Sequence, residues 1–373
     1  MKHAPLKIVM ITPQWLQTKG GPTYTVNSLA CKLREKDNLV WVLTCDIGEG
    51  ALKFSNRPIH REIEIFKLLK LLHPDIIHIH GRIHYVFPAW LYKLVFGLSS
   101  QIVFTFHTQP YIQDFLGSLA KGKPDYTGIK RVVAKFLLHR CDKVSGVSHS
   151  IISNLNKYCK MGLRRYSVIH TGNELAPVNG DRIKTFKSIH KLQKNFPIIS
   201  TIGVFAWDWK VAGHQVCIEA INLLEDKYPN IKLLIAGDGP YRQYLENIVR
   251  QLNIEDYIIF LGNVDNISEV LSCSDIYAHM AMNEGLGASV IEAMLSMKPI
   301  VAANAGGIPE IINHGTSGLL IKPNAQQLER AVEWLIKNPA DRLKLGENAY
   351  LYAIQSLNWD VTTQKYLNLY LCS

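Results

Sequence analysis

Short runs of consecutive apolar residues alternate along the whole sequence with longer segments of helical spacing. A strand that is apolar at nearly every position is buried on both faces, as happens in a parallel sheet covered by helices. The alternation therefore predicts an α/β fold with parallel sheets. The strands expected in the first half are 7–11, 38–44, 75–80, 101–107, 143–148 and 166–170. Those expected in the second half are 198–204, 231–237, 257–262, 275–280, 299–303 and 317–321.

The pattern occurs twice, which predicts two Rossmann-like domains. A chain of 373 residues is too long for one small core and fits two domains of ordinary size. The polar, basic stretch 174–195 interrupts the alternation, and we expect it to link an N-terminal domain at 1–173 to a C-terminal domain at 196–357. Ligands of open parallel sheets bind beyond the carboxyl ends of the strands, so two such sheets facing each other are expected to form a cleft.

Composition excludes several classes of protein. Hydrophobic residues make up 47% and charged residues 19%, a globular balance. No run approaches the roughly 20 apolar residues of a membrane span. The first apolar run is broken by Pro13 and is too short for a secretion signal. The 7 cysteines are scattered without a C-x-x-C arrangement, which favours free thiols over disulfides or a zinc site. We therefore expect a cytoplasmic protein.

The positive charge is concentrated in the first half. Residues 1–173 contain 24 Lys and Arg against 10 Asp and Glu, whereas residues 174–373 contain 17 against 21. Basic amphipathic helices are typical of proteins that contact an anionic membrane surface or a phosphate-bearing acceptor, although a solvated helix face is the alternative. Nucleic acid is disfavoured because no binding module accompanies the charge. The clearest basic cluster comprises Lys121, Lys123, Lys130, Arg131, Lys135 and Arg140.

The segment NEGLGASVIEA, residues 283–293, combines two carboxylates with a predicted loop-to-helix junction. Gly285 and Gly287 allow the main chain to approach a ligand, and the first N–H groups of the helix attract an anion. Glu284 is expected just before the helix and Glu292 about two turns inside it. Carboxylates accept hydrogen bonds from sugar hydroxyls. The segment therefore predicts a site for a sugar attached to a phosphate, and an ordinary solvated helix is the alternative.

Other candidate residues lie where the remaining strands end. Gly20 and Gly21 precede a helix but lack the G-x-G-x-x-G spacing, which disfavours a nicotinamide dehydrogenase. Lys210 lies beside a strand-to-helix junction, where its charge would neutralise a diphosphate. His107 ends the strand 101–107, a position at which a single histidine is more often structural.

Metal binding has little support in the sequence. The pair His78 and His80 has metal-ligand spacing but lacks a supporting cluster of carboxylates. No Asp-x-Asp occurs anywhere in the chain. Stabilisation of developing charge would therefore come from lysine and from backbone N–H groups.

The ordered set of motifs resembles the retaining glycosyltransferases of family 4, which have the two-domain GT-B architecture. The resemblance extends over nearly the whole chain, including a final helix at 358–373 that in the family crosses back to the first domain. Each motif is weak by itself, but their order is specific. The motifs are Gly20-Gly21, DIIHIHG at 75–81, FTFH at 104–107, Lys210 with Gly213-His214, AGDGP at 236–240, FLG at 260–262, NEGLGASVIEAM at 283–294, KPIVAANAGGIPE at 298–310 and HGTSGLLIKP at 314–323.

The resemblance implies a role for each candidate residue. Glu284 would accept the hydroxyls of the donor sugar, and Glu292 would bind the ribose. Lys210 would neutralise the leaving diphosphate, and His107 would line the reaction centre. Gly20 and Gly21 would pass close to the donor phosphate or the acceptor. The backbone amides that would approach the sugar and phosphate are those of Gly285, Leu286, Gly287 and Ala288.

Three positions depart from the family pattern. Gly203 is followed by Val204 instead of arginine, so one phosphate-binding cation is missing. The usual Lys-Gly step is displaced, since Ala212 precedes Gly213 and Lys210 lies two positions earlier. Leu286 stands where an aromatic residue is common, a change expected to affect sugar preference.

The resemblance implies an enzyme that transfers a sugar from a nucleotide-diphosphate donor to a saccharide or lipid-linked acceptor. It would retain the anomeric configuration and need neither a metal nor a cofactor. Two alternatives stay open at this point. A sugar-nucleotide 2-epimerase shares the two-domain architecture, and a catalytically weak nucleotide-sugar-binding protein would account for Val204.

Overall fold

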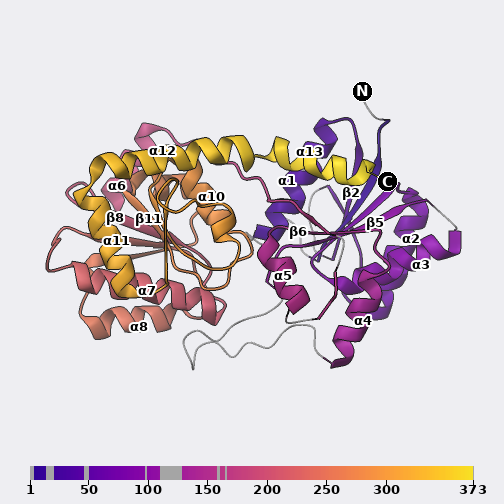
Figure 1. Ribbon diagram of the computed structural model, residues 1–373, viewed down its shortest axis with the longest axis horizontal. Helices are drawn as coiled ribbons and strands as arrows, with labels where there is room; N and C mark the ends of the chain where they lie inside the picture. Colours follow the sequence, from indigo (N-terminus) through magenta and orange to yellow (C-terminus); the bar gives the residue numbers. More distant parts are fainter. Residues whose placement is uncertain are drawn as a thin grey trace. The chain divides into compact units, whose positions relative to one another are not determined.

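The computed structural model describes residues 4–13, 21–45, 50–96, 99–109, 128–157, 160–163 and 166–372. They form two compact units (Figure 1). The first contains the described residues of 4–172 together with 358–372, and the second contains 173–357. Each unit has one parallel sheet with helices packed on it, so the predicted α/β fold with two Rossmann-like domains is confirmed.

The sheet of the first unit has the strand order β3-β2-β1-β4-β5-β6-β7, and its paired strands are all parallel. The edge strand β3 was not expected, because its three residues are partly or fully exposed and form no buried apolar run. The strands are β1 (Lys7–Ile11), β2 (Leu39–Thr44), β3 (Ala51–Lys53), β4 (Ile76–His80), β5 (Gln101–Phe106), β6 (Lys143–Gly146) and β7 (Ser167–Val168).

The helices of the first unit come from both ends of the chain. All of them except α13 lie between residues 21 and 157, where they connect the strands. They are α1 (Gly21–Glu35), α2 (Pro58–Leu72), the short η1 (Ile83–Tyr85), α3 (Val86–Phe96), α4 (Gly128–Leu138), α5 (His149–Lys157) and α13 (Trp359–Leu371).

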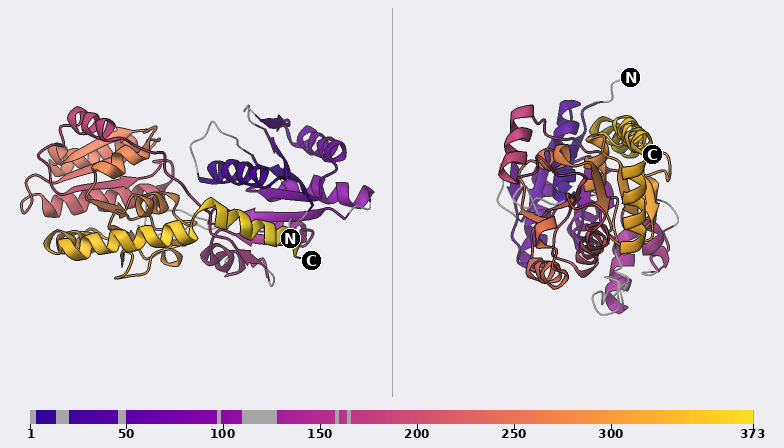
Figure 2. Two further views of the ribbon diagram at one scale, coloured as in Figure 1. Left: turned by 90° about the horizontal axis from the view of Figure 1, so that it is seen from above. Right: turned by 90° about the vertical axis from the view of Figure 1, so that its left-hand side faces the viewer.

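The C-terminal helix α13 is part of the core of the first unit. It lies beside α1 (Figure 2), and Trp359, Tyr366 and Tyr370 pack with apolar residues of β1 and α1. The helix begins at an N-cap in which Asn358 Oδ1 accepts a hydrogen bond from the Val361 N–H at 2.8 Å. Gly172 permits this entry, because a Cβ there would lie 2.5 Å from the Asn358 carbonyl carbon. The last helix therefore completes a core whose other buried members lie between Ile8 and Ile169.

The sheet of the second unit has the order β10-β9-β8-β11-β12-β13, again with parallel pairs. Its strands are β8 (Ile198–Ile202), β9 (Lys232–Ala236), β10 (Ile258–Gly262), β11 (Ile276–His279), β12 (Ile300–Ala303) and β13 (Leu319–Ile321). Its helical segments are α6 (Gly180–Ile189), α7 (Asp208–Leu224), α8 (Arg242–Leu252), η2 (Glu255–Tyr257), α9 (Ile267–Cys273), α10 (Ala288–Leu295), η3 (Ile308–Glu310), α11 (Ala325–Lys337) and α12 (Pro339–Ser356).

The stretch 174–195, expected to be a linker, is folded into the second unit. It contains α6, whose N-cap Asn179 accepts a hydrogen bond from the Arg182 N–H at 2.9 Å. Phe186 and Leu192 are buried in a cluster with residues of β8, β9 and α9. The polar surface of α6 concealed this role, because only a few apolar side chains anchor the helix.

Two further observations concern the described residues as a set. None of their helices is long and apolar enough to cross a membrane. Their cysteines are free thiols, with Cys217 and Cys273 buried.

The burial of α13 predicts a large effect of truncating its first residue. Trp359 is 2% exposed and packs edge-on against Tyr24 at a centroid distance of 6.0 Å. We expect Trp359→Ala to lower the free energy of unfolding by about 3–5 kcal/mol, through lost apolar burial and the cavity left behind. Urea denaturation measures the change. The exposed Leu371 on the same helix is the control, and Leu371→Ala should cost less than about 1 kcal/mol. Equal losses of stability in the two variants would contradict the burial of Trp359.

Candidate active site

The predicted loop-to-helix junction lies at the carboxyl end of β11. Glu284 is in the loop, and α10 begins at Ala288 after Gly287, whose φ of 96° lies in the left-handed region. A Cβ on Gly287 would also lie 2.5 Å from Ile308 Cδ1, so both conformation and space favour glycine there. Glu292 is the fifth residue of α10. It therefore lies about one turn inside the helix instead of the two expected, because the loop continues through Gly287.

Glu284 is a buried carboxylate with two basic neighbours. Its side chain is 15% exposed, and its Oε2 lies 3.7 Å from Lys210 Nζ and 3.5 Å from His279 Nε2. Burial would raise the pKa of this carboxyl, but Lys210, His279 and the Gly285 N–H outweigh it and lower the pKa to about 2. Glu284 is therefore ionised at neutral pH and acts only as a hydrogen-bond acceptor.

Lys210 reaches Glu284 from the first turn of α7. Its Nζ also lies 5.9 Å from the centroid of the Trp207 ring, a cation–π distance. The helix can approach this closely because Gly213 packs on the chain after β11, where a Cβ would lie 2.7 Å from the carbonyl carbon of Met280. The motif of lysine and glycine thus places the cation beside the carboxylate, even though two residues lie between Lys210 and Gly213 where the family pattern has none.

Gly306 supports the Glu284 loop from β12. Its φ is 59°, and a Cβ there would lie 2.2 Å from the Glu284 carbonyl oxygen. The next residue, Gly307, donates its N–H to the same oxygen at 3.1 Å. The glycine pair in the motif AGGIPE therefore holds the loop in place, a role that the sequence left unassigned.

Glu292 is held by a residue that sequence reasoning missed. Asn173 Nδ2 donates to the Ala288 carbonyl oxygen at 3.1 Å and approaches Glu292 Oε1 at 3.4 Å. Burial raises the pKa of Glu292 to about 7, and the Asn173 contact offsets only part of that effect. The pKa values of the two carboxyls of the motif are therefore shifted in opposite directions. Asn173 lies 119 residues before Glu292 in the chain, and no local pattern marks it.

His279 was also missed, although it lies within a predicted strand. It is the last residue of β11 and is 5% exposed. Its Nδ1 lies 3.2 Å from Tyr277 Oη and its Nε2 faces Glu284. Because β11 delivers this ring directly to the carboxylate, His279 helps to fix the position of Glu284.

His107 belongs to the first unit, whereas Lys210 and the residues of the Glu284 motif belong to the second. His107 directly follows β5, and its Nε2 lies 2.8 Å from His80 Nδ1. Burial lowers its pKa to about 4. Gly21 is the first residue of α1, and Gly20 lies outside the described residues.

The His-x-His pair does not form a metal site with other side chains of the described part of the chain, where no cluster of three metal-ligating side chains occurs. His78 uses both ring nitrogens within the protein, with Nδ1 2.7 Å from Tyr370 Oη and Nε2 2.7 Å from Thr105 Oγ1. The pair is therefore built into the hydrogen-bonded core of the first unit.

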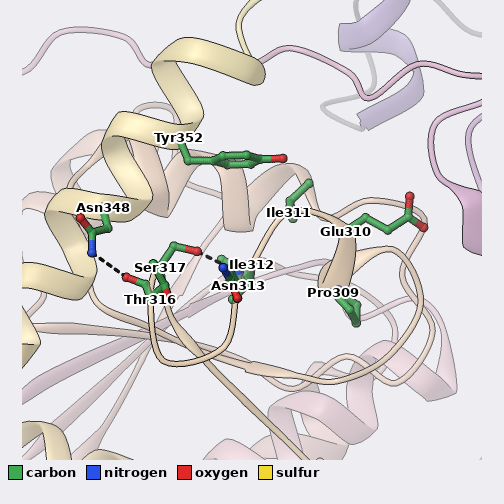
Figure 3. Close-up of a pocket in the computed structure, with 9 residues that line it drawn as sticks. All are labelled: Pro309, Glu310, Ile311, Ile312, Asn313, Thr316, Ser317, Asn348 and Tyr352. Atoms are coloured by element: carbon green, nitrogen blue, oxygen red, sulfur yellow. Dashed lines mark hydrogen bonds between the residues drawn. The ribbon is translucent and has the colours of Figure 1, made fainter.

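A separate cavity of about 290 Å³ lies in the second unit between η3 and α12 (Figure 3). Glu310, Asn313 and Tyr352 are among the residues that line it. Its polar walls are bonded to each other, since Ser317 Oγ accepts a hydrogen bond from the Asn313 N–H and Asn348 donates to Thr316. None of the predicted site residues lines this cavity.

The two parallel-sheet units have the GT-B architecture, and comparison of the sequence with known families agrees. Residues 19–176 match the family described as glycosyltransferase family 4, and residues 182–352 match glycosyl transferases group 1. The chain belongs to glycosyltransferase family 4 and is a glycosyltransferase with the GT-B fold.

Individual relatives share a modest fraction of residues. N-acetyl-alpha-D-glucosaminyl L-malate synthase of Bacillus anthracis is 28% identical over 298 residues, 79% of this chain and 74% of that protein. Alpha-monoglucosyldiacylglycerol synthase of Streptococcus pneumoniae is 24% identical over 315 residues, 82% of this chain and 68% of that protein. The crystal structure of Anabaena HepE in complex with UDP-glucose has a TM-score of 0.79 at 21% identity, covering 98% of this chain and 99% of that one.

The raised pKa of Glu292 predicts a pH-dependent stability difference. The unfolded carboxyl ionises near 4.5 and the folded one near 7, so the native protein loses stability as pH rises through this window. Glu292→Gln cannot ionise. We expect the variant to match the wild type near pH 4.5 and to exceed it by at most about 3 kcal/mol above pH 7. Urea denaturation at several pH values measures the difference. The control is Glu35→Gln, because the Glu35 side chain at the end of α1 is exposed. A stability difference between Glu292→Gln and the wild type that does not vary with pH would refute the raised pKa of Glu292.

Proposed function

We propose that the protein transfers a sugar from a nucleotide-diphosphate donor to a saccharide or lipid-linked acceptor, with retention of anomeric configuration and without a divalent metal. The observation that carries the proposal is the buried, ionised Glu284 beside Lys210 at the carboxyl end of β11. A carboxylate that is kept charged accepts hydroxyl hydrogen bonds, and a neighbouring ammonium group attracts phosphate.

The donor is proposed to lie along the loop from Glu284 to α10. Glu284 would accept hydrogen bonds from the sugar hydroxyls, and the amides of residues 285–288 at the start of α10 would face the diphosphate. Glu292 would accept hydrogen bonds from the ribose. Donor hydroxyls favour the ionised carboxyl, so ribose binding would lower the pKa of Glu292 from its raised value.

Departure of the nucleoside diphosphate requires stabilisation of the charge that develops on the leaving phosphate. Lys210 supplies a fixed positive charge, and the α10 amides supply oriented dipoles. Both are positioned before the reaction by packing, through Gly213 and Gly287. This arrangement supports a reaction that proceeds without a metal, and it assigns to Lys210 the task that the family shares between two cations.

The choice of donor and acceptor for a first test follows from the relatives. HepE was solved with UDP and with UDP-glucose, which makes UDP-sugars the first donors to examine. The names of two relatives indicate a small hydroxy acid as acceptor in one case and a glycolipid product in the other. A panel containing soluble and lipid acceptors therefore covers both possibilities.

Removing either charge of the pair should abolish most of the transfer. We expect Glu284→Gln and Lys210→Ala each to lower kcat/KM by about 100-fold or more, since each removes a charge-assisted contact to the bound donor. Transfer of labelled sugar to acceptor measures the effect, with Lys184→Ala, exposed on α6, as control. Conversion of labelled donor in the absence of acceptor would instead indicate the epimerase, and nucleotide binding without turnover would indicate the binding protein.

A second proposal concerns the surface of α4. Its buried side contains Ala134, Leu137 and Leu138, yet its exposed side also carries apolar residues at the spacing of one helical stripe. We propose that this stripe and its basic neighbours contact an anionic membrane surface, where a lipid-linked acceptor would be available. The stripe consists of Ile129, Val132, Val133 and Phe136, exposed by 84%, 65%, 49% and 45%. The neighbouring basic residues are Lys130, Arg131 and Lys135.

Membrane contact through α4 can be tested by sedimentation with vesicles. We expect binding to phosphatidylglycerol vesicles that weakens with salt, and little binding to phosphatidylcholine vesicles, because surface attraction is screened. The double variant Ile129→Ser, Phe136→Ser should reduce binding about tenfold or more, since it removes two inserting side chains. The control is Ile59→Ser, which changes an exposed apolar side chain on α2. Absence of binding to anionic vesicles at low salt would overturn the proposal.

A further inference from the structure

The ring nitrogens of two neighbouring histidines in the first unit share one hydrogen bond. His80 is the last residue of β4, and His107 follows the adjacent parallel strand β5. His80 Nδ1 lies 2.8 Å from His107 Nε2, and the two rings stack with centroids 5.1 Å apart. A neutral imidazole has one donor and one acceptor, so one nitrogen of this pair carries a proton and the other does not.

The surroundings of His80 decide which nitrogen carries the proton. His80 is 1% exposed, and its other nitrogen, Nε2, is buried without a hydrogen-bond partner among the described residues. A proton on Nε2 would therefore create an orphaned buried donor, which is rarer in proteins than an under-used acceptor. The favoured arrangement keeps the proton of His80 on Nδ1, where it is donated to His107 Nε2.

This arrangement fixes the chemistry of His107. Its Nε2 is occupied as an acceptor, so a neutral His107 carries its own proton on Nδ1. We infer that His107 serves the reaction as a neutral hydrogen-bond donor through Nδ1–H, directed at an oxygen of the bound substrate, and that His80 is the positioning residue that fixes this tautomer. The inference rests on the proposed function, because the substrate oxygen belongs to the donor or acceptor. It excludes His107 as a general base through Nε2.

The core of the unit holds His80 in place from behind. Its ring lies on His78, with centroids 3.9 Å apart, and His78 is bonded to Tyr370 of α13 and to Thr105 of β5 at 2.7 Å each. Thr105 is bonded in turn to Ser145 of β6 at 2.6 Å. Burial lowers the pKa of His78 and His80 well below the usual value. Both rings therefore remain neutral at neutral pH.

The tautomer of His107 can be measured without any activity. In protein labelled with ¹⁵N-histidine, protonated and unprotonated ring nitrogens have separate resonances, and His107→Gln assigns the signals of this ring. We expect the full-length wild type to show His107 as the Nδ1–H tautomer between pH 6 and 8. An Nε2–H tautomer, or a positively charged ring in this range, would overturn the inference.

Two variants of nearly equal shape separate the hydrogen bond from packing. In His80→Asn the side-chain Nδ2 can replace the imidazole Nδ1 as donor, whereas His80→Leu has no donor. We expect His80→Leu to release the tautomer of His107 and to lower kcat about tenfold or more with little change in the KM of the donor. His80→Asn should preserve the Nδ1–H tautomer and restore most of kcat. Equal kcat values for the two variants, with equal thermal stability, would overturn the positioning role.

The two measurements also separate this inference from the proposed function. If the wild type shows the Nδ1–H tautomer and His80→Leu loses it, the positioning by His80 stands even where no sugar transfer is detected, and it is the proposed function that fails. If transfer occurs but the wild-type tautomer is Nε2–H, the proposed function stands and the role of His80 is refuted. Tyr370→Phe, which removes only the contact to His78, is the matched control for loss of a polar group in the same core.

Discussion

The compensation of one buried charge organises the second unit. An ionised carboxylate that is largely removed from water requires basic or hydrogen-bonding neighbours, and Glu284 receives them from α7, β11 and its own loop. These three elements can meet only because two glycines remove side chains from the contact points. Gly213 brings α7 onto the chain after β11, and Gly306 lets the next strand-end loop approach Glu284. The ion pair thus explains why the glycines of the motifs have their positions.

The core of the first unit contains a different feature, a buried layer of polar rings. His78 and His80 occupy the same face of β4, and hydroxyl groups from β5 and α13 satisfy His78. Helix α13 therefore does more than cover apolar surface, since Tyr370 completes a hydrogen-bonded core that extends to His107. Buried hydrogen-bonded networks of this kind favour a single arrangement of side chains. The position of His107 consequently depends, through His80 and His78, on the last helix of the chain.

Most of the regular structure could be predicted because strands buried on both faces leave long apolar runs. The failures have local reasons. Strand β3 is exposed at the edge and has no such run. The segment with α6 was taken as a linker because it is mostly polar and is anchored in the core by few buried residues, among them Phe186 in the helix and Leu192 after it. Glu292 was placed about two turns inside α10 but lies about one turn inside it, since the loop continues through the left-handed Gly287. Each error arose where burial or backbone conformation depends on neighbours distant in sequence.

The sequence by itself determined the fold class, the order of the motifs and the residue types of the site. Periodicity, glycine positions and charge are properties of short segments, and they suffice for these conclusions. Only the tertiary structure decided which groups compensate each other. Lys210 meets Glu284 because the adjacent parallel strands β8 and β11 bring the segments that follow them to the same sheet end. Asn173 meets Glu292 although 119 residues separate them in the chain. The two glutamates of one motif have opposite pKa shifts, since burial raises the pKa of Glu292, whereas at Glu284 burial is outweighed by Lys210, His279 and the Gly285 N–H.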